Sequence, residues 1–364
     1  MSVKFQYTPS AYKAGKTYTA IPNVDAADLS ISRASSATRI NEDGLIEVMG
    51  DNVPRMDYTD GGCPVLLAEQ QAENLIEYSN SPTSPNWENN GTATVTLDTD
   101  ISPDGSVNAS TVSGATGVSF RTNNINVNLS GFNNNDDVCS SVWLKSKGAT
   151  NVRLIQRSDD GNLVFQDFNI TNDWARYYTT RNVGLFTNTQ FLIGGSDGDF
   201  LFYEAQTEIG IKPSSNIPTN GATAIRLSDD SIQTGDISQY IDSSNFTLEF
   251  TAKFSYLNDY ISVSNGDGAN SVRIFGETNT VFRANYLSNN VNNNESFITV
   301  LSVFDWHDFK LVFSNNVLDL FVDGVAATTN ILNTEPRNFT FSQLSLSTPP
   351  FGSFRGQIKS IKIS

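Results

Sequence analysis

The sequence predicts an all-β protein, in which a short N-terminal attachment region is followed by two β-sandwich domains. Only 17% of the residues are charged, so Asn, Ser and Thr must supply much of the polar surface, and these residues compete with helical backbone hydrogen bonds. Short runs alternate apolar and polar residues, which is the period of a strand with one buried face. Turns rich in Gly, Asn and Asp separate these runs at the spacing of a β-sandwich.

Residues 1–79 form the predicted attachment and connector region. In residues 1–27, aromatic and polar residues alternate as in a strand, and Pro9 and Gly15 interrupt the pattern. This stretch is too short to bury a core of its own, so we expect it to dock on the rest of the chain or on a partner. The remainder predicts a meander of short strands, with a helical turn or two over Leu67–Leu75.

Residues 80–224 form the first predicted sandwich. Its clearest strand is Ser141–Lys145, which mixes polar and apolar residues as a half-buried strand does. The predicted strands are Thr92–Leu97, Val138–Lys145, Val152–Gln156, Leu163–Ile170, Ala175–Thr180 and Leu201–Ile209.

Residues 225–364 form the second predicted sandwich. Leu311–Phe313 and Val317–Val322 flank an Asn-rich turn and predict a hairpin. The apolar residues that alternate along one strand, and should therefore face inward, are Phe246, Leu248 and Phe250.

The segment Gly210–Arg226 is the predicted boundary between the two sandwiches. It carries Pro213, Pro218 and Gly221 among polar neighbours, which is typical of a linker. We expect proteases to cut there before they cut inside either sandwich.

The charge pattern disfavours two classes of partner. The chain carries 23 Lys and Arg against 39 Asp and Glu, a formal net charge of −16. A nucleic-acid site needs clustered basic residues to neutralise phosphates, and the sequence has no such cluster. Adsorption to an anionic membrane is disfavoured for the same reason, and no apolar run approaches membrane-spanning length. We therefore expect neither nucleic acid nor membrane insertion.

Metal and redox chemistry find little support in the sequence. Its two cysteines, Cys63 and Cys139, lie far apart, and with His307 as the single histidine they are too few for a zinc site. The N-terminus shows no secretory signal, so a disulfide is not expected. No cofactor is predicted, although calcium at a sandwich rim stays open because backbone carbonyls could supply most of its ligands.

Catalytic residues are not expected either. His307 adjoins Trp306 at a strand start, where a structural role is the favoured interpretation over a Ser-His-Asp arrangement. The Glu-x-Asp-x-x-Glu strand motif of concanavalin-like glucanases is absent. The Asp-Gly groups at 159–161 and 266–268 are typical of turns, so they do not indicate a glycosidase pair.

Four aromatic residues are the candidates for glycan binding. Sugar sites in β-sandwiches use exposed rings that stack on pyranose faces, together with Asn, Asp and Arg. The candidates, which lie in or near predicted loops, are Trp87, Tyr256, Tyr260 and Tyr286. Rim packing or contacts between subunits are the alternatives. The other tryptophans fall in strand patterns and are predicted to pack in the core: Trp143, Trp174 and Trp306.

Three parts of the sequence resemble known families. Several runs between residues 28 and 79 resemble a connector found near the start of many tailed-phage virion proteins: Ser32–Arg39, Gly44–Glu47, Asn52–Tyr58, Gly62–Leu67, Glu69–Gln71 and Asn74–Ile76. The runs Ser102–Ala109, Ser141–Lys145 and Asn172–Tyr177 resemble carbohydrate-binding-module jelly rolls. Trp306–Gly324 and Phe354–Ile363 resemble the laminin-G or concanavalin-like fold.

The resemblance implies a non-enzymatic virion protein, a head or tail fibre-type appendage that displays lectin-like domains to host or environmental glycans. It would be made in the bacterial cytoplasm and exposed on the particle surface, with other virion proteins as partners. A purely architectural decoration or connector protein is the alternative, and a polysaccharide-degrading tailspike-type enzyme is a further one. We expect a homo-oligomer, a trimer, because symmetry multiplies weak glycan contacts and because Phe5, Tyr7, Tyr12 and Tyr18 have few local partners.

Overall fold

The computed structural model describes residues 2–116, 124–130, 132–158, 163–185, 188–229, 231–266, 269–332, 339–347 and 354–364. Over these ranges the chain is all-β, as the sequence predicts. Helical structure among them is limited to two short 3-10 turns, Asp25–Ala27 (η1) and Ser238–Tyr240 (η2). No helix in the described part of the chain is long and apolar enough to cross a membrane.

The chain divides into two compact units that differ from the predicted domains. Unit 1 contains residues 1–36, 49–71 and 227–364, and unit 2 contains residues 37–48 and 72–226. Unit 2 therefore interrupts unit 1 in the sequence. The predicted attachment region of residues 1–79 is not a unit of its own, because its residues are shared between the two. The boundary predicted near residue 225 agrees with the start of the last segment at Leu227.

Unit 1 is built from two sheets that enclose one apolar core. The first runs in the order β29-β28-β27-β22-β32-β8-β7, with β1 also paired to β32. Its strands are β1 (Phe5–Tyr7), β7 (Arg55–Asp57), β8 (Val65–Ala68), β22 (Asn245–Phe254), β27 (Trp306–Ser314), β28 (Val317–Val322), β29 (Val325–Ala326) and β32 (Gly356–Ile363).

The second sheet of unit 1 runs in the order β2-β3-β4-β21-β31-β23-β24-β25-β26-β30. Its strands are β2 (Tyr12–Lys13), β3 (Lys16–Thr17), β4 (Leu29–Ser32), β21 (Ser231–Gln233), β23 (Ile261–Ser264), β24 (Ser271–Thr278), β25 (Val281–Ser288), β26 (Val291–Thr299), β30 (Thr328–Ile331) and β31 (Gln343–Ser347).

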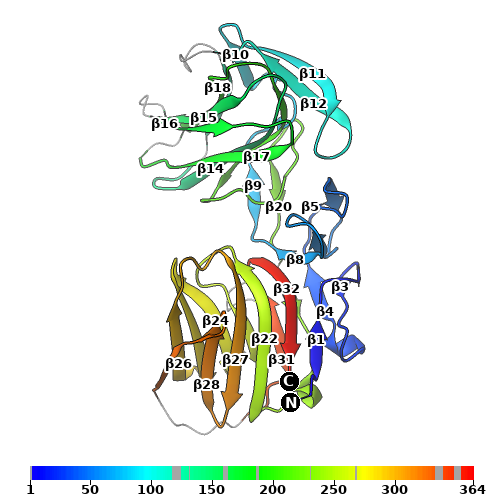
Figure 1. Cartoon of the computed structure of the whole chain (residues 1–364), viewed down its shortest axis with the longest axis vertical. Helices are drawn as coiled ribbons and strands as arrows, with labels where there is room; N and C mark the ends of the chain where they lie inside the picture. Colours follow the sequence, from blue (N-terminus) through cyan, green and yellow to red (C-terminus); the bar gives the residue numbers. More distant parts are fainter. Residues whose placement is uncertain are drawn as a thin grey trace. The chain divides into compact units, whose positions relative to one another are not determined.

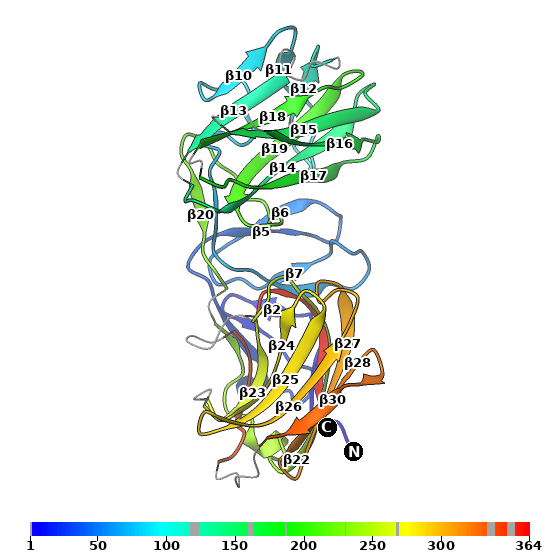
Figure 2. The same ribbon diagram turned by 90° about the vertical axis from the view of Figure 1, so that its left-hand side faces the viewer.

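Unit 2 is a sandwich of two five-stranded sheets around a second core (Figures 1 and 2). One sheet has the order β10-β13-β18-β15-β16: β10 (Trp87–Asn90), β13 (Asn124–Ser130), β18 (Asn188–Gly194), β15 (Asn151–Ser158) and β16 (Leu163–Asn169). The other has the order β11-β12-β19-β14-β17: β11 (Thr94–Ile101), β12 (Val107–Ser113), β19 (Phe200–Ile209), β14 (Asp137–Ser146) and β17 (Ala175–Asn182).

Two small ladders complete the strands of the structure. They are β9 (Ala72–Asn74) with β20 (Ala224–Arg226), and β5 (Ala37–Ile40) with β6 (Ile46–Met49). In the first ladder Ala72 lies opposite Arg226, so the chain enters and leaves unit 2 through adjacent strands.

The N-terminal segment docks on its own chain. Strand β1 pairs with β32, with Phe5 opposite Ile363 and Tyr7 opposite Ile361, and Figure 1 shows the two chain ends close together. The Phe5 and Tyr7 side chains are completely buried in the unit 1 core. These two rings therefore supply no exposed surface for sister chains, whereas Tyr12 and Tyr18 are half-buried, so the aromatic argument for a trimer loses two of its four residues.

The local predictions agree with the structure where one strand and its neighbouring turn determine the outcome. All six strands predicted for the first sandwich are present, as β11, β14, β15, β16, β17 and β19. The predicted hairpin is β27–β28, whose turn residues Asn315 and Asn316 have φ of 51° and 66°, as a type I′ turn requires. The helical turn predicted over Leu67–Leu75 is wrong, because β8 pairs with β32 and β7 instead.

The middle of the predicted linker is integrated into unit 2, whereas residues 211–212 and 220–223 are exposed. Ile217 donates its backbone N–H to Gln206 Oε1 at 2.8 Å, and Ser214 donates its own to Glu208 Oε1 at 2.7 Å. Asn216 and Ile217 are buried, and the segment ends in β20. The segment is therefore anchored to unit 2 at Ser214 and Ile217, and preferential cutting by proteases stays a prediction for its exposed residues.

A buried ion cluster joins Asp229 to three residues from the runs that resemble a connector: Arg33, Arg55 and Glu69. Asp229 accepts from Arg33 Nη1 at 3.0 Å, from Arg55 Nη2 at 2.6 Å and from the Glu69 backbone N–H at 2.9 Å. Arg55 also donates to Glu69 at 2.5 Å. Burial opposes the charge of Arg55, yet Asp229 and Glu69 together raise the pKa of Arg55 above its ordinary value. The motif thus has a structural role within unit 1.

Candidate functional site

Two of the four predicted glycan-binding aromatics are buried. Trp87 is 6% exposed, packs edge-on against Phe202 at 5.6 Å between ring centroids, and donates its indole N–H to the Tyr78 carbonyl. Tyr286 is 0% exposed and lies 4.9 Å from the Phe313 ring. Neither ring has a free face for a sugar, so this part of the prediction is corrected. Both residues face a sandwich core, which the loop-like sequence around them does not reveal.

The other two candidates are half-buried and carry guanidinium groups on their rings. Arg355 lies 4.4 Å from the Tyr256 ring centroid and is held by the buried Asp259. Arg273 lies 4.8 Å from the Tyr260 ring centroid. Each ring thus stacks on an arginine of its own chain. These contacts favour the alternative of rim packing for Tyr256 and Tyr260.

The three tryptophans predicted to lie in the core are instead half-buried. Each has its indole N–H satisfied: Trp143 by Asn216 Oδ1 at 3.0 Å, Trp174 by the Ile101 carbonyl at 3.0 Å, and Trp306 by Asp60 Oδ2 at 2.8 Å. Strand patterning did not distinguish these positions from Trp87.

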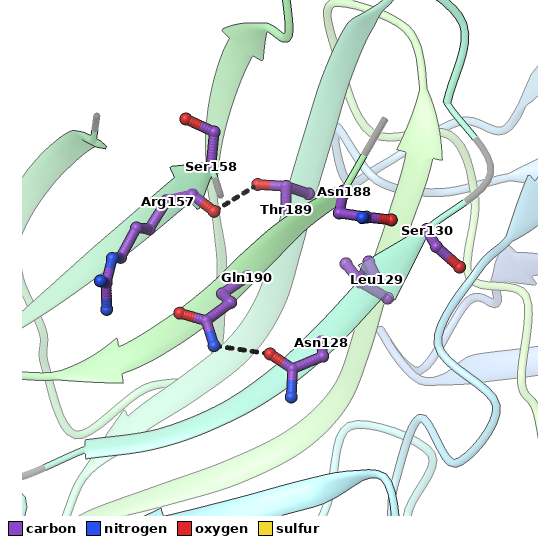
Figure 3. A pocket seen from close by; sticks show the side chains of 8 residues that line it. All are labelled: Asn128, Leu129, Ser130, Arg157, Ser158, Asn188, Thr189 and Gln190. Carbon is purple, nitrogen blue, oxygen red and sulfur yellow. Dashed lines mark hydrogen bonds between the residues drawn. The ribbon is translucent and has the colours of Figure 1, made fainter. Parts of the chain in front are cut away.

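A polar pocket of about 440 Å³ lies in unit 2, at the end of the sheet where β13 and β15 end and β18 begins (Figure 3). We call it the amide pocket. It is lined by Asn128, Leu129, Ser130, Arg157, Ser158, Asn188, Thr189 and Gln190. Its volume lies within the range of small-molecule sites. Unlike most such sites, it is lined mainly by amide and hydroxyl groups.

Strand register explains why these polar groups converge. Val127, Leu154 and Phe191 belong to the unit 2 core, so alternate residues on the same strands face outward. Gln190 lies opposite both Asn128 and Arg157, on the strands to either side. The three side chains form a row across β13, β18 and β15, which we call the polar row.

Hydrogen bonds between strands fix the polar row. Gln190 donates from Nε2 to Asn128 Oδ1 at 2.6 Å, as Figure 3 shows, and Asn128 donates from Nδ2 to Glu88 Oε1 at 3.4 Å. Thr189 donates from its hydroxyl to the Arg157 carbonyl at 3.0 Å. The amides are thereby preorganised, and each still has donor or acceptor capacity for a ligand.

An exposed aromatic ring lies beside the polar row. Phe165 on β16 is 48% exposed and occupies the position diagonal to Arg157, because Leu163 pairs with Arg157 and Phe165 with Ile155. The Arg153 guanidinium lies 4.2 Å from the Phe165 ring centroid. Arg153 also donates to both carboxylate oxygens of Asp167, at 2.5 and 2.7 Å, and these bonds lower the pKa of Asp167.

Sequence reasoning missed every residue of this site. The amides resemble those of ordinary Asn-rich turns, and Phe165 lies in a run with apolar residues on both faces, Leu163–Phe168. The sequence does show inward-facing and outward-facing residues in alternation along β13, β15 and β18, each taken separately. Only the pairing of strands that are distant in sequence makes it a site.

Two buried carboxyls with raised pKa values, Glu204 and Glu208, lie on β19 of unit 2, away from the lining of the amide pocket. Burial raises the pKa of Glu204 to about 7, whereas its hydrogen bond to Ser79 and the charge of Arg176 act in the opposite direction. Glu204 sits in β19 with a φ of 43°, a strained backbone for a non-glycine residue. Because its side chain is buried, it cannot serve as an acid or base for a ligand in the amide pocket.

The geometry of His307 fits the structural role that the sequence indicates. Its Nδ1 lies 2.7 Å from Asp323 Oδ2 and its Nε2 lies 2.8 Å from the Ser302 carbonyl oxygen. Both ring nitrogens are therefore engaged, and neither faces a nucleophile. Among the described residues, no group of three or more His, Cys, Asp or Glu side chains is placed to hold a metal ion.

Comparison with known proteins gives structural likenesses only. No protein-family model matches the chain, and no curated protein sequence matches it. A tandem pair of CBM22 domains from Paenibacillus barcinonensis Xyn10C is 11% identical, with 82% of this chain and 98% of that chain covered and a TM-score of 0.31. Domains LG4-5 of the mouse laminin alpha1 chain are 7% identical, with 77% and 89% covered and a TM-score of 0.28. Similarities of this size assign no family to the chain.

Proposed function

We propose that this chain is a glycan-binding protein and that the amide pocket is its sugar site. The observation that carries the proposal is the polar row along a pocket of about 440 Å³, in which Gln190 and Asn128 are joined by a cross-strand hydrogen bond and Arg157 lies beside them. Sugar hydroxyls both donate and accept hydrogen bonds, and side-chain amides match them in both roles. The Phe165 ring beside the row already carries the Arg153 guanidinium at 4.2 Å, so the amides and Arg157, rather than a stacking ring, support the proposal.

The lining supports binding without cleavage. Glycoside hydrolysis generally uses two carboxyl groups at a set separation. The eight residues that line the amide pocket include no carboxylate, imidazole or thiol. A non-enzymatic role is therefore the proposal, and the tailspike-type enzyme is its alternative.

The proposed setting is a phage particle, on which the chain would act as a head or tail fibre-type appendage. The support is the resemblance of residues 28–79 to the virion connector. Proteomics of density-purified particles from lysed cultures of the encoding host would test this setting. We expect the chain at a fixed copy number per particle. Recovery only in the soluble fraction would contradict it. Self-association as a trimer has the avidity argument and the half-buried Tyr12 and Tyr18 in its support, and light scattering of the full chain would test it.

A glycan array probed with the full chain tests the proposed function. We expect retention on a limited set of related glycans, and no release of reducing ends when the same glycans are incubated with the protein. Absence of retention on every glycan would favour the architectural alternative. Release of reducing ends would establish the enzyme instead.

A further inference from the structure

We infer that the sugar bound in the amide pocket carries a carboxylate, as a uronic acid does, and that Arg157 binds it. The inference rests on the proposed function and names its substrate class. Arg157 is the single charged residue among the eight that line the pocket. A guanidinium stays protonated at all physiological pH values, so the lining carries a fixed positive charge.

No carboxylate among the residues that the structure describes neutralises the charge of Arg157. Within the described part of the chain, its guanidinium makes no ion pair and no hydrogen bond, whereas Arg153 on the same strand is held by both oxygens of Asp167. The two arginines face the same side of the sheet, four residues apart. Arg153 therefore has its charge compensated by its own chain, and Arg157 is available to an anion from outside.

This local charge differs in sign from the chain as a whole. The net charge of −16 should repel acidic polymers at long range. At physiological ionic strength, however, charges further away than about 8 Å are largely screened. The eight described lining residues, which include one cation and no anion, then decide what binds.

The shape of the polar row favours a carboxylate attached to a sugar ring. Adjacent strands lie about 4.8 Å apart, which puts the backbones at Arg157 and Asn128 roughly 10 Å from each other with Gln190 between them. The planar guanidinium can donate two parallel hydrogen bonds to a carboxylate. With the carboxylate at Arg157, the ring hydroxyls of the same sugar would meet Gln190 and Asn128.

Matched polymers test the inference. Polygalacturonate, alginate and hyaluronate would each be compared with its carboxyl-reduced derivative, by biolayer interferometry with the full chain at 0.15 M salt. A charge-assisted hydrogen bond is worth enough for an affinity ratio of about tenfold or more. We expect at least one acidic polymer to bind that much tighter than its reduced form.

Variants then test the residue. Arg157→Gln should lower the affinity for the acidic polymer about tenfold or more and remove the preference for the acidic polymer over its reduced form. Arg39→Gln is the control, because Arg39 is paired with Glu47 in another sheet. This variant should change neither the affinity for the acidic polymer nor that for the reduced polymer. If acidic and reduced polymers bind equally, or if the array retains the chain only on neutral glycans, the inference that the bound sugar carries a carboxylate is wrong. The proposed function is not affected by either result. Undiminished acidic binding by Arg157→Gln would overturn the assignment of the residue. If the chain retains no glycan on the array and binds no polymer, both the carboxylate inference and the proposed function are wrong.

Discussion

Replacing Asp229 by Asn should destabilise unit 1 strongly, because Asp229 holds two buried arginines. Arg33 and Arg55 have side chains that are 0% exposed, and Asp229 bonds to both. Asn has nearly the same shape but no charge. The change leaves the two guanidinium groups with the Glu69 carboxylate and with the neutral backbone carbonyls that accept from Arg33. Breaking a buried pair on one side costs about 3–5 kcal/mol, because the remaining charge stays buried without compensation.

The assay is hydrogen exchange followed by mass spectrometry, which reports on both units in one sample. In peptides from unit 1, the free energy of opening that protects the amides should fall by about 3–5 kcal/mol, and peptides from unit 2 should serve as the internal reference. Glu249→Gln is the control within unit 1, since Glu249 and Lys362 form a half-exposed pair at 2.9 Å worth about 1 kcal/mol or less. If Asp229→Asn lowers stability no more than Glu249→Gln does, the reasoning about the ion cluster is refuted.

Two further predictions concern the division into units and the buried carboxyl. A chain that begins at residue 80 should not fold unit 1, because it lacks β1, β7 and β8, whereas a chain with residues 72–226 replaced by two glycines should fold it, since Ala72 and Arg226 are paired. Circular dichroism during thermal unfolding would check both chains. A cooperative unfolding transition of unit 1 in the first chain and not in the second would contradict the division into units. Glu204 has a folded pKa of about 7 against 4.5 ordinarily, so its folded form binds the extra proton and unit 2 should lose about 1–3 kcal/mol as pH rises from 5 to 8. Urea unfolding monitored by tryptophan fluorescence should show that Glu204→Gln removes this loss. If the free energy of unfolding depends on pH in the same way in both proteins, the role given to Glu204 is wrong.

Local sequence signals predicted much of this fold. Alternation and turn chemistry located the six strands of the first sandwich and the β27–β28 hairpin, since both depend on residues close together in the sequence. They failed where the outcome depends on distant strands. Nothing within residues 1–79 shows that β1 and β8 pair with β32.

The ion cluster and the tryptophans show the same limit. Arg33 and Arg55 are conspicuous in the connector motif, but Asp229 lies 196 and 174 residues away from them. Trp87 was predicted to be exposed and is buried, while Trp143 was predicted to be buried and is half-exposed. What covers each ring is another segment, which the sequence around the tryptophan does not specify.

The candidate site was beyond sequence reasoning for a related reason. Asn128 and Gln190 are 62 residues apart and meet only because β13 pairs with β18. Aromatic residues were the expected signal of a sugar site, and the structure places the expected rings in cores or beneath arginines. The site is instead built from amides, which are too common in this chain to stand out.

The most direct test of the central claim is the affinity of the amide pocket for a glycan that the array identifies. Isothermal titration would compare the full chain with the double variant Asn128→Ala/Gln190→Ala. The control is Asn89→Ala/Asn169→Ala, which removes two exposed amides from the edge strands of the same sheet. Loss of two side-chain hydrogen-bonding groups should weaken binding roughly tenfold, and the control should bind as the unmodified chain does. Equal affinity of the pocket variant and the unmodified chain would contradict the assignment of the sugar site.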